Sequence, residues 1–173
     1  MKIEIPDEVF SDEELKNTPN RYKKFLKEWL VDSQDFKFTT FPKPKGMDQM
    51  IVIKDIPFYS MCSHHLLPFI GKAHIGYIPN KKICGLSKVA RVLDKFAHRP
   101  QLQERLTQQV VDYLDKELEP VGVMVVLEAE HLCMSMRGIK RPNHKTVTSA
   151  IKGMFIQNNI KSEFMELVYN GCK

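Results

Sequence analysis

The sequence predicts an α+β domain in which an antiparallel sheet carries two helices packed on one face. The first observation is the order of the expected elements, which runs helix, two strands, two helices and two strands. The second is that the two central helices are consecutive and each carries one apolar stripe. The third is size, because 173 residues, 43% of them hydrophobic and 27% charged, suit one globular domain with a substantial core.

The N-terminal part of the chain is predicted to be helical over residues 6–32. Thr18 is a candidate N-cap, and Pro19 suits the first position of a helix. Apolar residues then recur at spacings of three and four, as one helix face requires: Tyr22, Phe25, Leu26 and Trp29. The turn-rich, basic stretch 41–49 is typical of a loop. We therefore divide the chain into an N-terminal helical segment with linker, 1–49, and a main domain, 50–173.

The main domain alternates strand and helix signals. Residues 50–60 and 71–79 favour strands, the first because it is short and β-branched and the second because it alternates. Helical stripes lie in 87–97 and 101–118, and Arg99-Pro100 separates them. The remaining elements are a long strand over 121–138, a strand over 146–155 and a short helix or ragged end in SEFMELVYN.

Charge and hydropathy limit the partners and the compartment. The formal net charge of +5 favours an anionic partner: nucleic acid, a membrane surface or a small phosphate-rich ligand. The sequence has no apolar stretch near the roughly 20 residues that a membrane span requires. Its acidic N-terminus has no secretory signal, so we expect a cytoplasmic protein. In that compartment the four cysteines are thiols or metal ligands, and Cys84 and Cys172 read as buried or incidental thiols.

The stretch MCSHHLLPF, residues 61–69, places a cysteine and two histidines within four residues. Adjacent side chains point apart on a regular backbone, whereas Cys62 and His65 can converge from a turn. A second pair, His131 and Cys133, lies in the long strand, and residues two apart in a strand share a face. The pattern therefore offers Cys62, His65 and Cys133 as metal ligands, with His64 and His131 left over nearby.

The residues alone leave three interpretations open. Two cysteines and one histidine with an open position form a catalytic zinc arrangement, in which a bound water is acidified towards neutrality. A second histidine would instead close a structural site. The third interpretation is that no metal is bound.

Four motifs resemble GTP cyclohydrolase I in order and spacing. They are Cys-x-His-His at Cys62, GLSKxxR from Gly85, RPQxQERLT from Arg99 and HxCxxxRG from His131. The resemblance covers about residues 17–168 and begins at NTPNR, which is similar to that family's DTPxR helix start. It implies a tunnelling fold (T-fold), whose sheets join into a barrel on oligomerisation, and makes 50–173 the catalytic domain.

The resemblance implies a zinc ion bound by Cys62, His65 and Cys133. Zinc-activated water would attack C8 of the guanine ring of GTP, giving formate and 7,8-dihydroneopterin triphosphate. That product enters folate, biopterin or deazapurine synthesis. His64 and His131 would be the acid/base pair, and Ser87 matches a serine near the ribose and phosphates.

The resemblance also implies the groups that hold GTP. Gln103 and Glu104 match the purine-reading pair, and a buried carboxylate would accept the guanine N–H protons and reject adenine. Three cations match the phosphate-contacting positions: Lys88, Arg91 and Arg137. Lys140, Arg141 and Lys145 are basic neighbours that a solvated loop explains equally well.

One residue departs from the family pattern, because Ser63 stands where the family usually has glutamate. A carboxylate there orients a histidine, so the serine predicts retuned or slower turnover.

The family forms toroidal homodecamers with active sites at subunit junctions, and we expect the same assembly with a shorter N-terminus. Alternatives are a relative with another purine nucleotide substrate or product, and a catalytically weakened paralogue. The hypothesis of a zinc-stabilised protein that binds nucleic acid lacks support. Basic and aromatic residues do not interleave along the sequence as they do in proteins that bind single strands.

Overall fold

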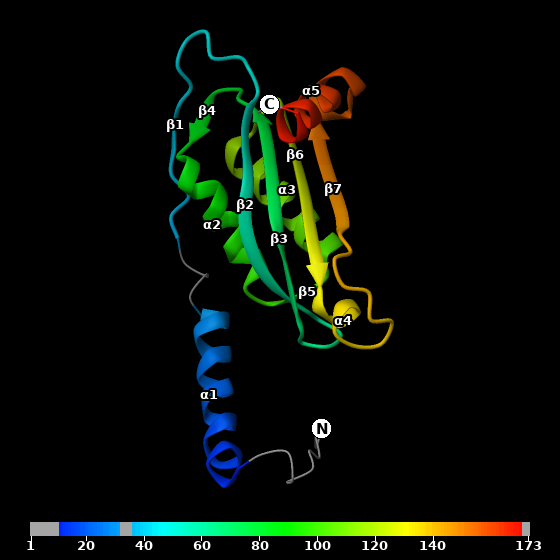
Figure 1. Cartoon of the computed structure of the whole chain (residues 1–173). Coiled ribbons are helices and arrows are strands. Elements are labelled where there is room, and N and C mark those ends of the chain that lie inside the picture. The colour runs from blue at the N-terminus through cyan, green and yellow to red at the C-terminus, as the bar shows by residue number, and fades with distance from the viewer. Residues whose placement is uncertain (1–10, 32–35, 171–173) are drawn as a thin grey trace.

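A five-stranded sheet organises the chain (Figure 1), seen here in a computed structural model that describes residues 11–31 and 36–170. The strand order is β5-β2-β3-β6-β7, antiparallel except where β5 runs parallel to the end of β2. The strands are β2 (Ile51–Cys62), β3 (Pro68–Ile78), β5 (Pro100–Gln101), β6 (Gly122–His131) and β7 (Thr146–Gly153). Two short strands, β1 (Thr40–Pro42) and β4 (Lys82–Cys84), pair separately. The antiparallel sheet predicted from the sequence is confirmed.

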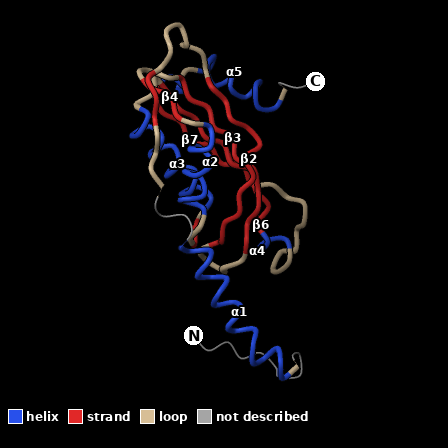
Figure 2. Tube along the Cα trace, turned by 90° about the vertical axis from the view of Figure 1, so that its left-hand side faces the viewer, coloured by secondary structure: helices blue, strands red, loops and turns tan. Residues whose placement is uncertain are grey.

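Two helices cover one face of this sheet, as predicted. They are α2 (Leu86–Ala97) and α3 (Gln103–Leu118), and Figure 2 shows both on the same side of the strands. Their apolar stripes meet alternate residues of β3 and β6, because successive strand side chains point to opposite faces. Phe69, Ile75, Val125 and Leu127 are fully buried in this contact. The burial of apolar side chains such as these is the main favourable contribution to folding.

A helix that follows β7 covers part of the opposite face. It is α5 (Asn158–Tyr169), reached through a 3-10 turn at Met154–Ile156. Phe164 and Val168 pack against Met124 and Val126 of β6. Gly76 makes this packing possible, since a Cβ there would lie 2.6 Å from the Phe164 ring. The short C-terminal helix is thus confirmed, and it lies on the sheet face away from α2 and α3 (Figures 1 and 2).

The N-terminal helix α1 (Asp12–Val31) extends beyond one end of the sheet (Figure 1). It begins with a capping box, because Ser11 and Glu14 exchange hydrogen bonds between side chain and backbone. Pro19 lies inside this helix, so the prediction of a separate start at Thr18 and Pro19 is wrong. The predicted helical residues 6–10 and 32 lie outside the described residues. Within residues 11–31 and 36–170, no helix is both long and apolar enough to cross a membrane.

The strand predicted over 121–138 is wrong in its second half. β6 ends at His131, and the next four residues form a helical turn, α4 (Leu132–Ser135). The backbone turns here because the Met136 N–H donates to the Leu132 carbonyl, a local bond that a paired strand does not make. His131, Cys133, Ser135 and Arg137 therefore do not form one row along a strand. The loop predicted over 41–49 is also modified, since its first two residues belong to β1.

His74 is a buried histidine on the sheet face away from α2 and α3. Its side chain is 5% exposed, and its Nδ1 accepts a hydrogen bond from the Asp55 N–H at 3.2 Å. Its Nε2 lies 3.5 Å from the Glu128 carboxylate, which also accepts a hydrogen bond from the Tyr169 hydroxyl of α5. Lys145 lies 3.5 Å from the same carboxylate. The cluster thus ties β2, β3, β6 and α5 together through polar contacts.

We expect His74 to make the fold less stable in acid. Burial lowers the pKa of His74, and this outweighs the opposite effects of Glu128 and Asp55. Below the unfolded pKa of about 6.5, the unfolded state therefore binds more protons, and the free energy of unfolding falls as the pH falls. Urea unfolding of the wild type and His74→Asn between pH 7.5 and 5 measures this. The variant should lose less stability across that range, and equal pH slopes would contradict the assignment.

Candidate functional site

The turn between β2 and β3 holds Cys62 and His65 at one end of the sheet. The Cys62 N–H donates to the Leu67 carbonyl at 2.9 Å, and the Leu66 N–H donates back to the Cys62 carbonyl at 2.8 Å. Leu66 has a positive φ of 53°, which folds the chain back so that His65 faces Cys62. The His65 Nδ1 lies 3.7 Å from the Cys62 sulfur. Both side chains are therefore mounted on a backbone fixed by hydrogen bonds.

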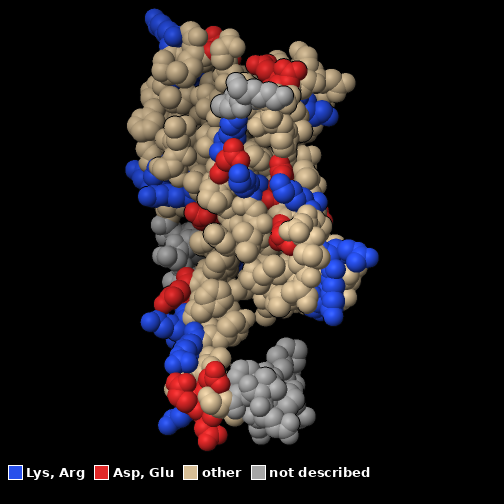
Figure 3. Space-filling model, viewed as in Figure 1, with Lys and Arg blue, Asp and Glu red and all other residues tan. Residues whose placement is uncertain are grey.

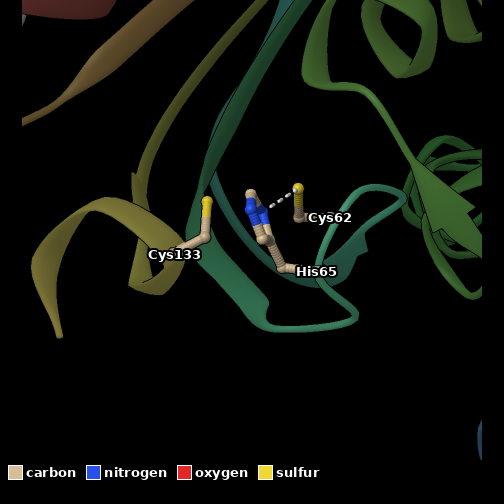
Figure 4. A group of neighbouring side chains, drawn as sticks. All are labelled: Cys62, His65 and Cys133. Carbon is tan, nitrogen blue, oxygen red and sulfur yellow. Dashed lines mark hydrogen bonds between the residues drawn. The ribbon is translucent and has the colours of Figure 1, made fainter. Parts of the chain in front are cut away.

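Cys133 joins this pair from the helical turn α4. The ligand atoms of Cys62, His65 and Cys133 all lie within 4.8 Å of one another. Figure 4 shows the two sulfurs and the imidazole pointing toward a common space from three segments: the end of β2, the turn and α4. Such a group of thiols and imidazole could hold a metal ion. These are the three residues that the sequence offered as ligands, although the helical turn, not a strand, presents Cys133.

The thiol of Cys133 is disfavoured in its charged form by its surroundings. Burial raises the pKa of the Cys133 thiol, and the neighbouring Cys62 raises it further. Two thiolates this close need a positive charge between them. A cation that accepts sulfur and nitrogen ligands would supply it, which agrees with the chemistry of the donor set.

The two remaining histidines come from the β2–β3 turn and from the end of β6. His64 is exposed in the turn, with its Nδ1 3.9 Å from the Cys62 sulfur. His131 ends β6 and stacks on Phe69 at 4.6 Å with nearly parallel rings. Burial lowers the pKa of His131, and His144 adds to this, whereas Glu104 acts in the opposite direction. His64 thus lies beside the Cys–His–Cys group, and His131 comes two residues before Cys133 along the chain.

Two charged residues predicted to contact substrate lie close to this end of the sheet. Glu104 is exposed in the first turn of α3, near enough to His131 to affect its pKa. Arg137 follows α4 and acts electrostatically on Cys133. Basic side chains gather over the loop after α4 in Figure 3, and that loop carries Arg137, Lys140, Arg141 and Lys145.

A carboxylate holds this basic loop closed. Glu130 accepts a hydrogen bond from the Ser135 hydroxyl at 2.6 Å and another from the Asn143 N–H at 3.1 Å. Both bonds lower the pKa of Glu130, so the carboxylate is charged near neutral pH. The Arg141 N–H also donates to the Met134 carbonyl at 2.9 Å. These contacts give the loop after α4 a defined shape beside the end of β6.

The other predicted substrate contacts lie further away within the chain. Three of them are in the first two turns of α2: Ser87, Lys88 and Arg91. The helix ends at Ala97, whose carbonyl accepts a hydrogen bond from Ser60, two residues before Cys62. Ten helical residues rise about 15 Å, so Ser87 lies about that far along the helix axis from the end that reaches β2.

A comparison with known families places this chain. A family model described as GTP cyclohydrolase I matches residues 2–169. The chain belongs to the GTP cyclohydrolase I family. It is 54% identical over 162 residues to GTP cyclohydrolase 1 of Hydrogenobaculum sp. (strain Y04AAS1), covering 93% of this chain and 88% of that protein. GTP cyclohydrolase 1 of Aquifex aeolicus (strain VF5) is 54% identical over 157 residues, covering 90% and 85%.

Membership of the GTP cyclohydrolase I family identifies the chain as an enzyme and confirms the predicted fold. The archaeosine synthase QueF-Like in the apo form is a solved structure with a TM-score of 0.50 and 15% identity. The match covers 60% of this chain and 93% of that one. At this identity the likeness concerns the fold alone, and it supports the T-fold with a curled antiparallel sheet and helices packed on it.

Two contacts of the site were not predicted from the sequence. One is the stacking of Phe69 on His131, which depends on the pairing of these two residues between β3 and β6. The other is the hydrogen bond from His131 to the buried Gln103 at 2.8 Å. Gln103 was expected to read the purine, and that role remains a prediction. The sequence does contain one signal for this bond. A polar residue on the buried stripe of a predicted helix indicates that its side chain has a hydrogen-bonding partner inside the fold.

Proposed function

We propose that this enzyme hydrolyses GTP to 7,8-dihydroneopterin triphosphate and formate, using a zinc ion held by Cys62, His65 and Cys133. The observation that carries the proposal is the convergence of two thiols and one imidazole from separate segments, within 4.8 Å of one another. Sulfur and nitrogen donors in this number suit a catalytic zinc site that retains an open position. When bound, zinc there supplies Lewis-acid activation of water near neutral pH.

The remaining roles are assigned to residues of the chain. His64 and His131 move protons to and from the purine ring. Glu104 accepts the N1 and amino protons of guanine, which adenine does not offer in the same pattern. Arg137 and its basic neighbours hold the triphosphate, because guanidinium groups bind phosphate oxygens in pairs. The cytoplasmic location expected from the sequence is part of this proposal.

We infer that the enzyme works as a homo-oligomer, with the homodecamer as the expected form. The outer edge of β7 and most of the outer edge of β2 face no other strand among the described residues. Open edges at both sides of a sheet suit pairing between copies, and repeated pairing closes into a ring. In such a ring, Ser87, Lys88 and Arg91 of one copy would contact the nucleotide held at the Cys–His–Cys group of another.

A turnover assay tests the proposed function. Purified protein loaded with zinc should release formate from GTP and form a fluorescent pterin, and a chelator should stop both until zinc is restored. ATP should give no formate, because it lacks the guanine protons that Glu104 accepts. Ser63→Glu is run beside the wild type, since Ser63 favours a slower enzyme. Formate from Ser63→Glu alone would support the weakened paralogue instead, and formate from neither protein would reject the proposal.

A further inference from the structure

The Gln103 side chain is buried and fully occupied at the start of α3. It is 1% exposed. Its Nε2 lies 3.1 Å from the Leu127 carbonyl and 3.0 Å from the Thr146 carbonyl, oxygens that only accept hydrogen bonds. The amide nitrogen must therefore face β6 and β7. The amide oxygen, Oε1, then has one direction left, and it lies 2.8 Å from His131 Nε2.

A chain of hydroxyl groups reinforces this orientation. The Thr107 hydroxyl donates to the Gln103 backbone carbonyl at 2.7 Å, so its single proton is used. The Thr148 hydroxyl lies 2.7 Å from Thr107 and must be the donor in that contact. Its lone pair then faces Gln103 Nε2 at 3.1 Å, so the two hydrogens of the amide are shared among three acceptors. The donors and acceptors of this network are thus consistent with one orientation of the Gln103 amide. Exchanging its oxygen and nitrogen would break the three contacts of Nε2 with Leu127, Thr146 and Thr148.

The network sets the protonation pattern of His131. An amide oxygen only accepts, so His131 Nε2 must carry a hydrogen to make the 2.8 Å bond. In the neutral ring, Nδ1 then carries none. The ring is also held in its plane by stacking on the buried Phe69 at 4.6 Å and 3°. Both the orientation and the tautomer of His131 are thus fixed by groups on other elements.

We propose that Gln103 is a positioning residue that holds His131 as the Nε2–H tautomer, leaving Nδ1 as the nitrogen that exchanges a proton with substrate. The role of His131 in proton transfer rests on the proposed function, whereas the Gln103–His131 bond rests on the geometry alone. The proposal also separates Gln103 from Glu104. The first residue acts through His131 and the second contacts the purine.

The decisive variant is Gln103→Met, which keeps the side-chain volume and removes the hydrogen bonds. Loss of a group that orients a catalytic histidine costs about 10- to 100-fold, so kcat should fall by that factor. KM for GTP and the zinc content should stay near the wild-type values. Gln101→Met is the matched control, since Gln101 is also fully buried but bonds Phe96 and Gln109 instead of His131. A raised KM with unchanged kcat in Gln103→Met would instead indicate purine reading and overturn the proposal.

A double-mutant cycle separates positioning from general damage. If Gln103 acts through His131, adding Gln103→Met to His131→Asn should cause no further loss of kcat. Additive losses would show that Gln103 matters for another reason and would reject the proposal.

Solid-state NMR of protein labelled with 15N-histidine reads the tautomer directly and does not depend on turnover. The wild-type His131 signal, identified by its absence in His131→Asn, should show Nε2 protonated and Nδ1 bare. Gln103→Met should give a mixture of tautomers. Nδ1 protonation in the wild type would overturn the proposal, even if the variant fails to fold. If the wild type does not convert GTP, the proposed function fails while this measurement still decides the Gln103–His131 bond.

Discussion

Cys133→Ser is expected to abolish both metal binding and GTP turnover. Cys133 is the one member of the Cys–His–Cys group that comes from outside the β2–β3 turn. Without it, Cys62 and His65 are left as two ligands from the same turn. The loss of activity should exceed the roughly 100-fold that removal of a group contacting a ligand costs, since a ligand itself is removed. Atomic absorption gives the zinc content, and formate release gives the turnover.

The matched control for this experiment is Cys84→Ser. Cys84 is also a buried free thiol, but it lies beside Tyr77, whose pKa is raised to about 12 by burial, and it belongs to no metal-binding group among the described residues. Serine can replace its contact with the Tyr77 hydroxyl. We expect this variant to keep its zinc and its turnover. A Cys133→Ser protein that also retained both would exclude Cys133 as a ligand.

Mixing two inactive variants is expected to restore activity if the site is shared between copies. Cys133→Ser removes the metal group, and Arg91→Ala removes a cation of α2, so each variant alone should be nearly inactive. In random mixed assemblies, about a quarter of the sites would combine an intact metal group from one copy with an intact α2 from another. Co-expression with two different tags, followed by purification on both tags, yields the mixed assemblies.

The control pairs Cys133→Ser with Cys62→Ser, since both changes damage the same group of one chain. This pair should stay inactive in mixed assemblies. The mixed assemblies of Cys133→Ser with Arg91→Ala, proven to contain both tags, could also stay inactive. That result would mean that the metal group and α2 in each site come from the same copy. The shared-site part of the proposal would then be wrong, while the zinc chemistry would stand.

The regular elements were predictable because each carries its own local signal. Alternation marked β3, and one apolar stripe each marked α2 and α3. The end of β6 was not predictable in this way, since the residues after His131 are compatible with a strand by propensity. A local hydrogen bond decides for the helical turn α4. Pro19 gave a wrong helix start for a related reason, because the capping box that begins at Ser11, eight residues earlier, already starts the helix.

The candidate site was predictable at the level of residue types and not at the level of partners. Cys62, His65 and Cys133 stand out because three soft ligands are rare in a short sequence span. The role of Gln103 depends on the register of β6 with β7 and on the position of α3 above them. Those contacts join residues 24 to 45 positions apart, so no local pattern contains them.

The closure of the basic loop by Glu130 has a thermodynamic consequence. A flexible chain segment loses conformational entropy when a ligand orders it, and that loss weakens binding. Here the hydrogen bonds that Glu130 accepts from Ser135 and Asn143 restrict the segment before any anion arrives. Under the proposed function, a polyphosphate captured by Arg137 and its neighbours would meet an already shaped surface, so binding would not have to order the loop.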